Sequence, residues 1–534
     1  MGKRALVLVI ACACSGGGTD GMGGDDGPGP LPAPSCKRGP SPSATVKPPE
    51  LVYTLSDRWQ EAWLGSPAVA DLDGDGIIEI VVPRDELLVA WHATSNGGGV
   101  VAWKQTMPGR IWSSPVVADL VPSRPGLEVA VASRGQIFAF DAKGQPLPGF
   151  PVTWRDELRS LAAGDLDGDG SLELVAVTST PLDQGGQRDI VFAVHGDGTK
   201  VTGFPPNTSG SAGCDAACYV TGGYDQNLAL GDVDGDGKAD LFATQDNAYM
   251  SLHAGTGRAF DAAPMFSGRT KFSGIRWMVD YRLAQQGYAD NEAVDEQAHF
   301  TNTAPAIADL DGDGKPELIA LGSIQNAAQT DREKGVGLFV AHPDGTRPDA
   351  WVMPPRFPGY LAGLWDFGDN LVGITNQVSV AELDPAQPGP ELVFAGFDGK
   401  LHAVSARGEE LWSRTYTTSA EEWTAGVAIA DLSEDGIPEL VMTTYGTTGG
   451  RLLILDAGGN ILHDVPLGGR GAMPVPTIAD VDGDHSLDIV VSLKDAVDKA
   501  KSVVVYDVSS SLDNCLLWPT GRGNNRRDGY LPPH

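Results

Sequence analysis

One short acidic segment recurs along this chain and is its clearest candidate for chemistry. The pattern is D-x-D-G-D-G-x-x-E, and its six well-kept copies begin at Asp71, Asp165, Asp232, Asp309, Asp431 and Asp480. In a tight loop alternate residues turn inward, so the acids at positions one, three and five can face a common centre. The glycines at positions four and six allow backbone angles that residues with a Cβ avoid. Such a flexible cage of oxygen atoms suits Ca²⁺ better than Mg²⁺ or a transition metal.

Position seven is expected to add a backbone carbonyl and position nine a carboxylate where the next strand begins. The predicted ligands of about six calcium ions are Asp71, Asp73, Asp75, Ile77, Glu79, Asp165, Asp167, Asp169, Ser171, Glu173, Asp232, Asp234, Asp236, Lys238, Asp240, Asp309, Asp311, Asp313, Lys315, Glu317, Asp431, Ser433, Asp435, Ile437, Glu439, Asp480, Asp482, Asp484, Ser486 and Asp488. The alternative is that these are solvated acidic turns. The repetition of the same positions argues against it, because so many close carboxylates repel one another without cations.

The loop differs from an EF-hand, which needs a glutamate at position twelve and flanking helices. Position twelve is Val82, and β-branched residues surround the loop. Two degenerate copies begin at Asp119 and Glu382 and lose most of the acids, but they keep the later Glu128 and Glu391. We interpret these two copies as repeat units without a bound ion.

The acidic loops must be held by short strands. In the first unit, segments Ser66–Ala70, Glu79–Val82, Leu87–Trp91 and Val100–Lys104 read as four strands, and the last unit repeats this plan and ends on Cys515–Trp518. Four antiparallel strands per unit of this length are typical of a propeller blade, and one blade cannot bury both of its faces alone. The sequence therefore predicts an all-β propeller, with eight four-stranded blades favoured over seven.

The two ends of the chain are expected to meet in such a ring. The stretch Leu51–Trp63 resembles the fourth-strand segment of the first unit, so it is predicted to complete the last blade and remove an open edge. A bridge between Cys36 and Cys515 would then be within reach, and the alternative is that Cys515 is a buried thiol. Cys214 and Cys218 are close enough in sequence to close a small disulfide of their own.

The first residues resemble a bacterial lipoprotein signal, with a basic start, a short apolar stretch and a lipidation box that ends at Cys12. The alternatives are secretion without an anchor, a misassigned start codon and a fortuitous apolar run. We divide the chain into a signal segment at 1–14, a disordered Gly/Ser/Pro-rich tether at 15–49 and a calcium-binding propeller at 50–534, with an insertion at about 258–300.

The acidic loops and strands resemble the FG-GAP or VCBS-type repeats of the integrin α-subunit propeller and of many bacterial surface proteins. The resemblance covers about residues 50–520, and Trp518-Pro519 followed by Arg527 and Gly529 is similar to the closing segment of bacterial members. It implies calcium at positions one, three, five, seven and nine of each good loop, with these loops on a lower face. It also implies partner binding on the opposite, upper face.

Four residues are candidates for that upper face. Trp63, Trp112, Arg159 and Trp423 each lie a few residues before a loop acid, where the chain enters the first strand of a unit. Exposed around the channel mouth, they would suit sugars or protein side chains. The alternative is that the indoles pack between blades.

The net charge of −32 argues against nucleic acid and anionic membrane surfaces as partners. No zinc-protease, serine-hydrolase or nucleotide-binding motif is found. We expect a monomeric, exported binding, adhesion or scaffolding module for a protein or carbohydrate ligand, without a catalytic residue that stands out. Its location would be the outer membrane or cell surface, held only by a lipid anchor, or otherwise outside the cell. The alternative is a propeller-type polysaccharide lyase or glycosidase.

Overall fold

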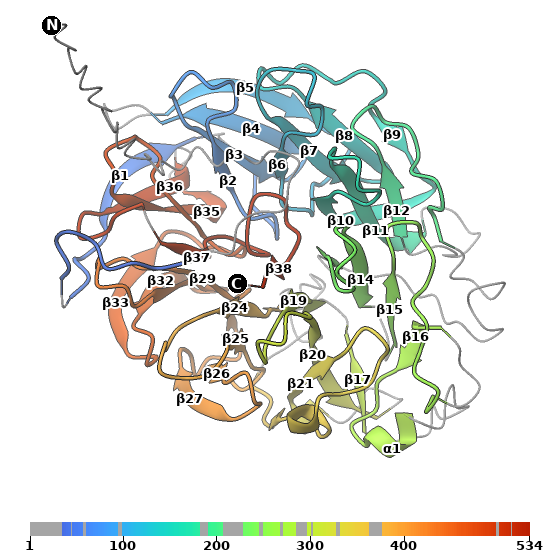
Figure 1. The fold of residues 1–534 in the computed structure, drawn as a ribbon. Helices are drawn as coiled ribbons and strands as arrows, with labels where there is room; N and C mark the ends of the chain where they lie inside the picture. Colours follow the sequence, from blue (N-terminus) through green and yellow to red (C-terminus); the bar gives the residue numbers. More distant parts are fainter. Residues whose placement is uncertain are drawn as a thin grey trace, which may run out of the picture.

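The blades are arranged as a closed ring. The computed structural model describes residues 35–43, 45–56, 60–93, 99–181, 191–206, 228–244, 249–266, 271–284, 296–300, 303–326, 332–361, 376–497, 501–513 and 515–533. In this part of the chain eight small antiparallel sheets follow one another around a central axis (Figure 1). The prediction of an eight-bladed all-β propeller is confirmed, and the seven-bladed alternative is wrong.

Each blade runs from an inner strand at the axis to an outer strand at the rim. The inner strands of blades 1 to 8 are, in order, β2 (Ala68–Ala70), β6 (Val116–Ala118), β10 (Asp156–Gly164), β13 (Leu228–Gly231), β19 (Ala306–Ala308), β24 (Ser379–Ala381), β29 (Val427–Ala430) and β34 (Thr477–Ala479). The second strands are β3 (Glu79–Arg84), β7 (Glu128–Ser133), β11 (Glu173–Pro181), β14 (Asp240–Thr244), β20 (Glu317–Gln325), β25 (Glu391–Ala395), β30 (Glu439–Thr443) and β35 (Leu487–Val497).

The third strands are β4 (Leu87–His92), β8 (Gln136–Phe140), β12 (Val191–Val194), β15 (Tyr249–His253), β21 (Val336–Ala341), β26 (Lys400–Val404), β32 (Gly450–Leu455) and β36 (Lys501–Val508). The fourth strands of blades 1, 2 and 4 to 8 are β5 (Val100–Thr106), β9 (Val152–Thr153), β16 (Ser273–Arg276), β22 (Arg356–Phe357), β27 (Glu410–Thr415), β33 (Ile461–Leu467) and β1 (Glu50–Leu55). We call the face that carries the turns from inner to second strands the lower face, and the opposite one the upper face.

The remaining elements are short. They are β17 (Gln297–His299), which pairs with β20; β18 (Thr303–Ala304), which pairs with β23 (Asn376–Gln377); β28 (Glu422–Trp423), which pairs with β31 (Tyr445–Gly446); β37 (Leu516–Trp518); β38 (Tyr530–Leu531); the helix α1 (Tyr281–Ala284); and two 3-10 turns at Arg332–Lys334 and Asp349–Trp351.

Hydrophobic patterning changes across each blade. The second strand β3 is buried at every position, whereas the outer strands β5 and β33 alternate between exposed and half-buried residues over most of their length. A strand that is covered by neighbouring blades on both faces needs an apolar residue at every position, and a strand at the rim does not. The main core therefore lies between adjacent blades.

Three tryptophans, two on outer strands and one in the 3-10 turn that ends at Trp351, connect one blade to the next. The indole Nε1 atoms of Trp103, Trp351 and Trp412 each donate to a carbonyl oxygen in a turn of the following blade, at Ala142, Ala406 and Ala457, over 2.9–3.0 Å. Gly144 follows the first of these turns with a φ of 73°, and a Cβ there would lie 2.6 Å from the Trp103 ring. Glycine is therefore favoured at this position for two reasons: it adopts the positive φ readily, and it has no Cβ that would collide with the indole.

The ring closes through its N-terminal strand. Strand β1 pairs antiparallel with β36, from Glu50 opposite Asp507 to Leu55 opposite Val503, and so forms the rim of blade 8 (Figure 1). The prediction that this segment completes the last blade is confirmed. The prediction that Cys515–Trp518 forms the fourth strand there is wrong: β37 pairs with β29, the inner strand of blade 7. The N-terminal strand already occupies the rim position, so the last segment turns to the axis.

A disulfide joins the two ends at that point. Cys36 is bonded to Cys515 with a Cα–Cα distance of 4.7 Å, as the closed ring allowed. Cys12, Cys214 and Cys218, the signal segment and most of the proposed tether lie outside the described residues. In the described part of the chain we find no helix that is long and apolar enough to cross a membrane.

The C-terminal segment after Cys515 fills the axis of the ring. Its backbone carbonyl oxygens accept hydrogen bonds of 2.8–3.1 Å from backbone N–H groups in, or directly after, the inner strands of six blades. The pairs, with the carbonyl residue first, are Cys515 and Asp431, Pro519 and Ile478, Asn525 and Val117, Arg526 and Ala163, Asp528 and Leu230, and Gly529 and Ile307. In blade 1 the Asn525 side chain donates to the Val69 carbonyl, and beside blade 6 the Arg522 N–H donates to the Gln377 side chain. We call residues 515–531 the axial plug.

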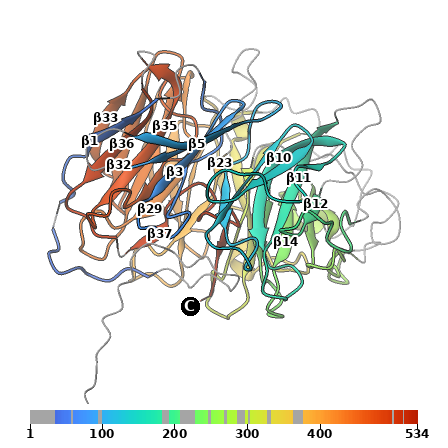
Figure 2. The same cartoon turned by 90° about the horizontal axis from the view of Figure 1, so that it is seen from above.

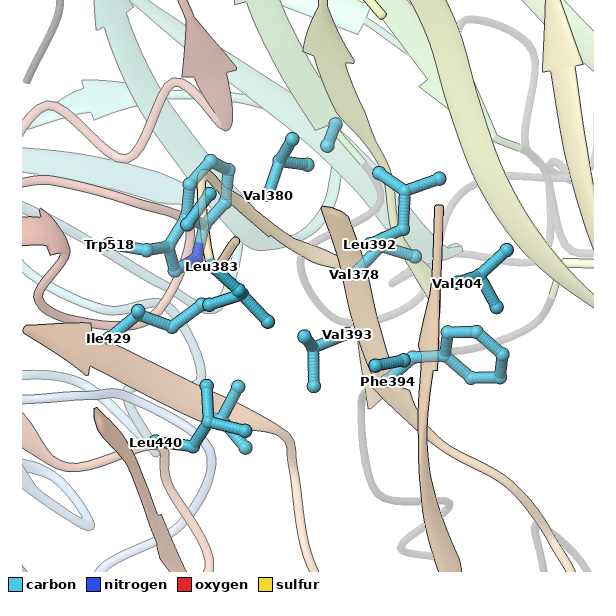
Figure 3. Close-up of a cluster of buried hydrophobic side chains, with 14 of the residues drawn as sticks. Val378, Val380, Leu383, Leu392, Val393, Phe394, Val404, Ile429, Leu440 and Trp518 are labelled. Atoms are coloured by element: carbon cyan, nitrogen blue, oxygen red, sulfur yellow. The ribbon is translucent and has the colours of Figure 1, made fainter. Parts of the chain in front are cut away.

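Trp518 anchors the axial plug in the core. It lies with Val380, Leu383 and Ile429 in one apolar cluster shared by blades 5, 6 and 7 (Figure 3). Strand β38 runs parallel to β19 toward the turn that follows it, so the chain ends at the lower face, as the side view shows (Figure 2).

Two arginines of the axial plug are fully buried and bind carbonyl groups around the axis. Arg527 donates to the carbonyl oxygens of Pro67, Pro115 and Gly521 at 2.7–3.0 Å, and Arg522 donates to those of Leu161 and Arg527. Burial lowers the pKa of both guanidinium groups to about 9, so both remain charged at neutral pH. These two side chains hold the plug to blades 1, 2 and 3.

We predict that Arg527→Leu destabilises the whole ring. The substitution leaves several buried carbonyl oxygens without a donor, which should lower the free energy of unfolding by about 3 kcal/mol. Urea denaturation of the oxidised protein measures it, with the exposed Arg407→Leu as the matched control. Equal midpoints for the two variants would contradict the role given to the plug.

Candidate metal sites

The acidic turn of blade 1 folds around its own first aspartate. The N–H groups of Gly74 and Gly76 donate to the two carboxylate oxygens of Asp71 at 2.8 Å, and Ile77 N–H donates to Asp75 at 2.8 Å. Gly74 and Gly76 have φ values of 75° and 83° with nothing near the place of a Cβ. Glycine is thus favoured there by backbone conformation and not by space.

The turns of the other five good copies have the same hydrogen bonds. In each, the backbone N–H of position six donates to the aspartate at position one, and the backbone N–H of position seven donates to the acid at position five, over 2.7–3.1 Å. Two of them use a residue with a Cβ at a positive φ, Glu434 with 60° in blade 7 and His485 with 71° in blade 8.

Carboxylate oxygens meet within these turns. One oxygen each from Asp71, Asp73 and Asp75 lie within 4.8 Å of one another; the same holds for Asp165, Asp167 and Asp169, and for Asp232, Asp234 and Asp240. Calcium–oxygen distances are about 2.4 Å, so three oxygens this close can contact one ion. The donor set is entirely hard oxygen, which fits calcium.

Position seven contributes no side chain to the cluster. Ile77 and Ile437 are 44% and 47% exposed, and their side chains lie in solvent. An isoleucine side chain has no ligand atom, so in these two loops only the backbone carbonyl of position seven could coordinate an ion.

The ninth-position acid has a structural role that the sequence did not reveal. In all eight blades one of its carboxylate oxygens accepts a hydrogen bond of 2.6–3.0 Å from the backbone N–H of the second loop residue. Blades 2 and 6 are included, through Glu128 and Glu391. Retention of these two glutamates in the degenerate copies is thereby explained without a metal.

Burial makes the same acids hard to ionise. It raises the pKa to about 7 for Glu79, Glu128 and Glu173, and to about 8 for Asp240, Glu439 and Asp488. In the good loops the neighbouring aspartates raise the pKa further, as Asp71, Asp73 and Asp75 do for Glu79. A cation bound between these carboxylates would favour their charged forms.

Histidines face the ninth acid in three blades. The Nδ1 atoms of His92, His195 and His342 lie 2.9, 3.0 and 3.5 Å from the second oxygens of Glu79, Glu173 and Glu317. Each histidine stands at or just after the end of the third strand, beside the start of the second. A histidine recurs at the end of the third strand in these three blades, so its pairing with the ninth acid could have been predicted once the strand register was known.

The chain ends add contacts to the loops of blades 7 and 8. The N–H groups of Gly39 and Ser43 donate to the carbonyls of Glu434 and Ser433 at 2.8 Å, so the segment after Cys36 covers the blade 7 loop. In blade 8 the Tyr53 hydroxyl donates to Asp482 at 2.7 Å. Asp431 is fully buried as a result, whereas the first acids of the other turns are partly exposed or at the edge of burial.

The upper-face candidates come together but do not present their aromatic faces. Trp63, Trp112 and Trp423 are 7%, 8% and 8% exposed and pack with Leu64, Tyr445 and Met473 in one cluster, the upper cluster. The expectation of exposed indoles is not met, and packing between blades describes them. The physical reason is that cationic side chains lie over the rings of Trp63 and Trp112, while Trp423 stacks against Tyr445.

These cationic side chains form the surface of the upper cluster. The Arg110 guanidinium lies 3.6 Å from the Trp63 ring centre and 4.7 Å from that of Trp112, and Arg159 lies 4.3 Å from Trp112. Both are held by carboxylates, Arg110 by Asp85 and Arg159 by Glu157, and they are 35% and 17% exposed. Stacking on an indole fixes a guanidinium plane while its N–H edges stay available.

Lys494 is the most buried cation of this region. Its side chain is 1% exposed, with the Nζ 3.1 Å from the Trp63 ring centre and 3.1 Å from a Glu61 carboxylate oxygen. Burial lowers the pKa of Lys494 to about 8, despite the opposing effect of Glu61.

Two further histidines, His253 and His402, are buried in the core. His253 is buried and its Nδ1 lies 3.2 Å from the Gly257 carbonyl oxygen, while His402 lies between Glu410 and Asp398 at 2.9 and 3.2 Å. The described part of the 258–300 insertion is also packed: Trp277 and Tyr281 are buried beneath the Arg347 guanidinium, which lies 5.1 and 4.8 Å from their ring centres.

Cavities in the described part of the chain are small. Three on the lower side measure about 180, 230 and 260 Å³; the second is lined by loop and plug residues that include Asp165, Asp232 and Tyr530. Pockets for small molecules usually measure about 300–1,000 Å³. These three cavities are smaller than such pockets.

Comparisons with known proteins support the fold alone. No model of a known protein family matches the chain, and no curated protein sequence does. Among solved structures, the V. cholerae biofilm matrix protein Bap1 is similar, with 14% identity over 91% of this chain and 96% of that chain and a TM-score of 0.52. The exotype rhamnogalacturonan lyase YesX has 15% identity over 90% and 80% of the two chains and a TM-score of 0.49.

We predict that stability without calcium falls as pH rises. The ninth acids have a pKa near 4.5 or below when unfolded and about 7–8 when folded, so folding takes up protons between these values. The stabilisation is complete below about pH 4.5 and is lost as pH rises to about 8. Bound calcium removes the protons, so the rise in melting temperature that calcium causes should grow from about pH 5 to about pH 8.

Differential scanning fluorimetry of metal-depleted protein, with and without calcium across this range, measures the effect. A calcium-induced rise that is equal at both ends of the range would contradict the proposed coupling between protons and ion.

Proposed function

We propose that this chain is an exported, calcium-stabilised propeller of FG-GAP or VCBS type that acts as a binding or adhesion module for a protein or carbohydrate ligand. The observation that carries the proposal is the axial plug. The chain's own C-terminal segment occupies the axis of the ring and is hydrogen-bonded to the inner strands. A closed, filled ring is a rigid support on which surface loops can bind a partner.

Calcium is assigned to the lower face by the convergence of its carboxylates. In the loops of blades 1, 3 and 4, oxygens of three acids lie within 4.8 Å of one another, and the six good loops each contain a buried ninth acid with a raised pKa. In this proposal the ions are structural: they neutralise the turns and fix the inner and second strands of each blade. Affinities of extracellular calcium modules, about 10⁻⁴ to 10⁻³ M, would keep such sites filled outside the cell.

The ligand surface is assigned to the upper cluster and its arginines. The guanidinium groups of Arg110 and Arg159 lie 4.7 and 4.3 Å from the Trp112 ring centre, and Arg470, bound to Asp495 and Glu61, is 31% exposed. Fixed guanidinium groups suit carboxylates by paired hydrogen bonds. An acidic sugar or an acidic protein side chain is therefore the ligand chemistry that this surface supports best.

Lipid anchoring at Cys12 completes the proposal for location. The chain segment that follows Cys36 lies on the lower face over the blade 7 loop. A tether that leaves from there would turn the lower face toward the membrane and the upper cluster outward. An unanchored, secreted chain would carry the same two faces.

Lys494 favours a second candidate, a polysaccharide lyase. An amine with a pKa of about 8 can remove a proton near neutral pH. Its side chain is nearly inaccessible, however, so a reaction would first have to open the contact with Trp63. Binding is therefore the better supported function.

We predict that calcium, and not magnesium, stabilises the metal-depleted protein. At a concentration ten times the dissociation constant, each occupied site adds about 1.4 kcal/mol to the free energy of unfolding. Six sites should raise the melting temperature well beyond the effect of equal ionic strength. Calorimetry in calcium, magnesium and sodium chloride measures it, and equal melting temperatures in all three salts would contradict the calcium assignment.

A second prediction concerns the ligand. On an array of acidic and neutral polysaccharides, the wild type should retain acidic polymers, and Arg110→Gln with Arg159→Gln should weaken retention at least about tenfold. Arg407→Gln on the lower side is the matched control.

The same polymers, incubated in solution, are followed by ultraviolet absorbance for the unsaturated product of a lyase. Product formation that Lys494→Gln abolishes would favour the second candidate. If the variant with both Arg110→Gln and Arg159→Gln retained acidic polymers as well as the wild type does, a ligand site at the upper cluster would be contradicted.

A further inference from the structure

The two degenerate loops differ from the good ones in length. Both place the later glutamate one residue farther from the first acid than the good loops do. In both, that glutamate still accepts the backbone N–H of the second loop residue, Glu128 from Leu120 at 2.9 Å and Glu391 from Leu383 at 2.7 Å. The turn is therefore held in the same way, and the two loops can be compared by their remaining charges.

The blade 2 loop contains its own cation. It retains Asp119 and Glu128, and burial raises the pKa of Glu128 to about 7 while the Arg124 guanidinium acts in the opposite direction. The Arg124 N–H also donates to the Val121 carbonyl at 2.8 Å, which folds the loop back on itself. The blade 2 loop thus has a cationic side chain whose charge partly opposes that of its carboxylates.

The blade 6 loop has three acids instead. Glu382, Asp384 and Glu391 stand at its start, third position and end, and the intervening residues Pro385, Ala386 and Gln387 carry no charge. The charged groups that act on Glu382 are Glu391 and Asp384, and both raise its pKa. Asp384 raises the pKa of Glu391 as well.

Two carboxylate oxygens in this loop have no hydrogen-bond partner in the part of the chain that the structure describes. Glu391 is fully buried, and its Oε1 is unpaired while its Oε2 accepts the Leu383 N–H. The Oε1 of Glu382 is also buried and unpaired. In blades 1 and 3 the equivalent oxygen of the ninth acid has a histidine within 3.0 Å.

Buried carboxylate oxygens without donors are costly, and close carboxylates cannot all remain charged without a cation. We propose that the blade 6 loop binds a seventh calcium ion, held by Glu382, Asp384 and Glu391. Hard oxygen ligands on a turn between two strands are the same donor set as in the six good loops. This inference rests on the calcium part of the proposed function and corrects the interpretation of this loop from sequence as ion-free.

The test is the ratio of calcium to protein. The full-length chain is depleted with a chelator and brought to equilibrium by dialysis against buffer in which free calcium is held well above about 10⁻³ M. The bound calcium is the excess of metal on the protein side of the membrane over the buffer side, measured by mass spectrometry and divided by the protein concentration. We expect seven ions for the wild type and six for Glu382→Gln. Asp384→Asn should also lose one ion. Because Asp384 is exposed, this substitution should not disturb folding, so a loss of calcium would report on the site itself. Asp119→Asn in blade 2 is the matched control and should keep seven.

Each other outcome decides against the inference in a distinct way. Six ions in the wild type that persist in both blade 6 variants would overturn the seventh site and leave the six good loops standing. Such a result would mean that Glu382 and Glu391 share a proton. No bound calcium in the wild type would overturn the seventh site together with the calcium part of the proposed function.

Discussion

A buried carboxylate at the start of the second strand holds the lower turn of every blade. It accepts the N–H of the second turn residue in all eight copies, at distances of 2.6–3.0 Å. The bond fixes the turn, and the turn sets the position of inner strand against second strand. The same burial raises the pKa of the acid, so each turn needs a proton, a cation or a guanidinium nearby. In this proposal, the charges of the other loop residues decide whether a proton, a cation or a guanidinium neutralises the buried acid of a given blade.

Closure of the ring depends on both ends of the chain. Strand β1 supplies the rim of blade 8, and the axial plug supplies acceptors for inner-strand N–H groups that would otherwise face an empty axis. The disulfide between Cys36 and Cys515 joins the segment over the blade 7 loop to the start of the plug. The contacts of these two segments therefore lie on the lower face and along the axis.

The sequence predicted the fold well because its repeat is local. Each acidic turn and its flanking strands lie within one unit, so the blades, their number and the closing strand β1 could be read directly. Features that join distant units could not. Cys515–Trp518 resembled a rim strand, but its partner β29 is far away in sequence. The indoles of Trp63 and Trp112 were expected in solvent, and only the fold shows that Arg110 and Arg159 cover them. The contrast between the two degenerate loops also required the buried, unpaired oxygens of Glu382 and Glu391.

We propose above that the acidic turns are cages for calcium. The most direct measurement is a crystal structure with anomalous scattering recorded near the calcium edge, which locates each ion independently of its coordination. The account predicts anomalous peaks about 2.4 Å from the carboxylate oxygens of the turns that begin at Asp71, Asp165, Asp232, Asp309, Asp431 and Asp480, and none in the turn that begins at Asp119. Turns without peaks in saturating calcium, with their carboxylates directed into water, would contradict it.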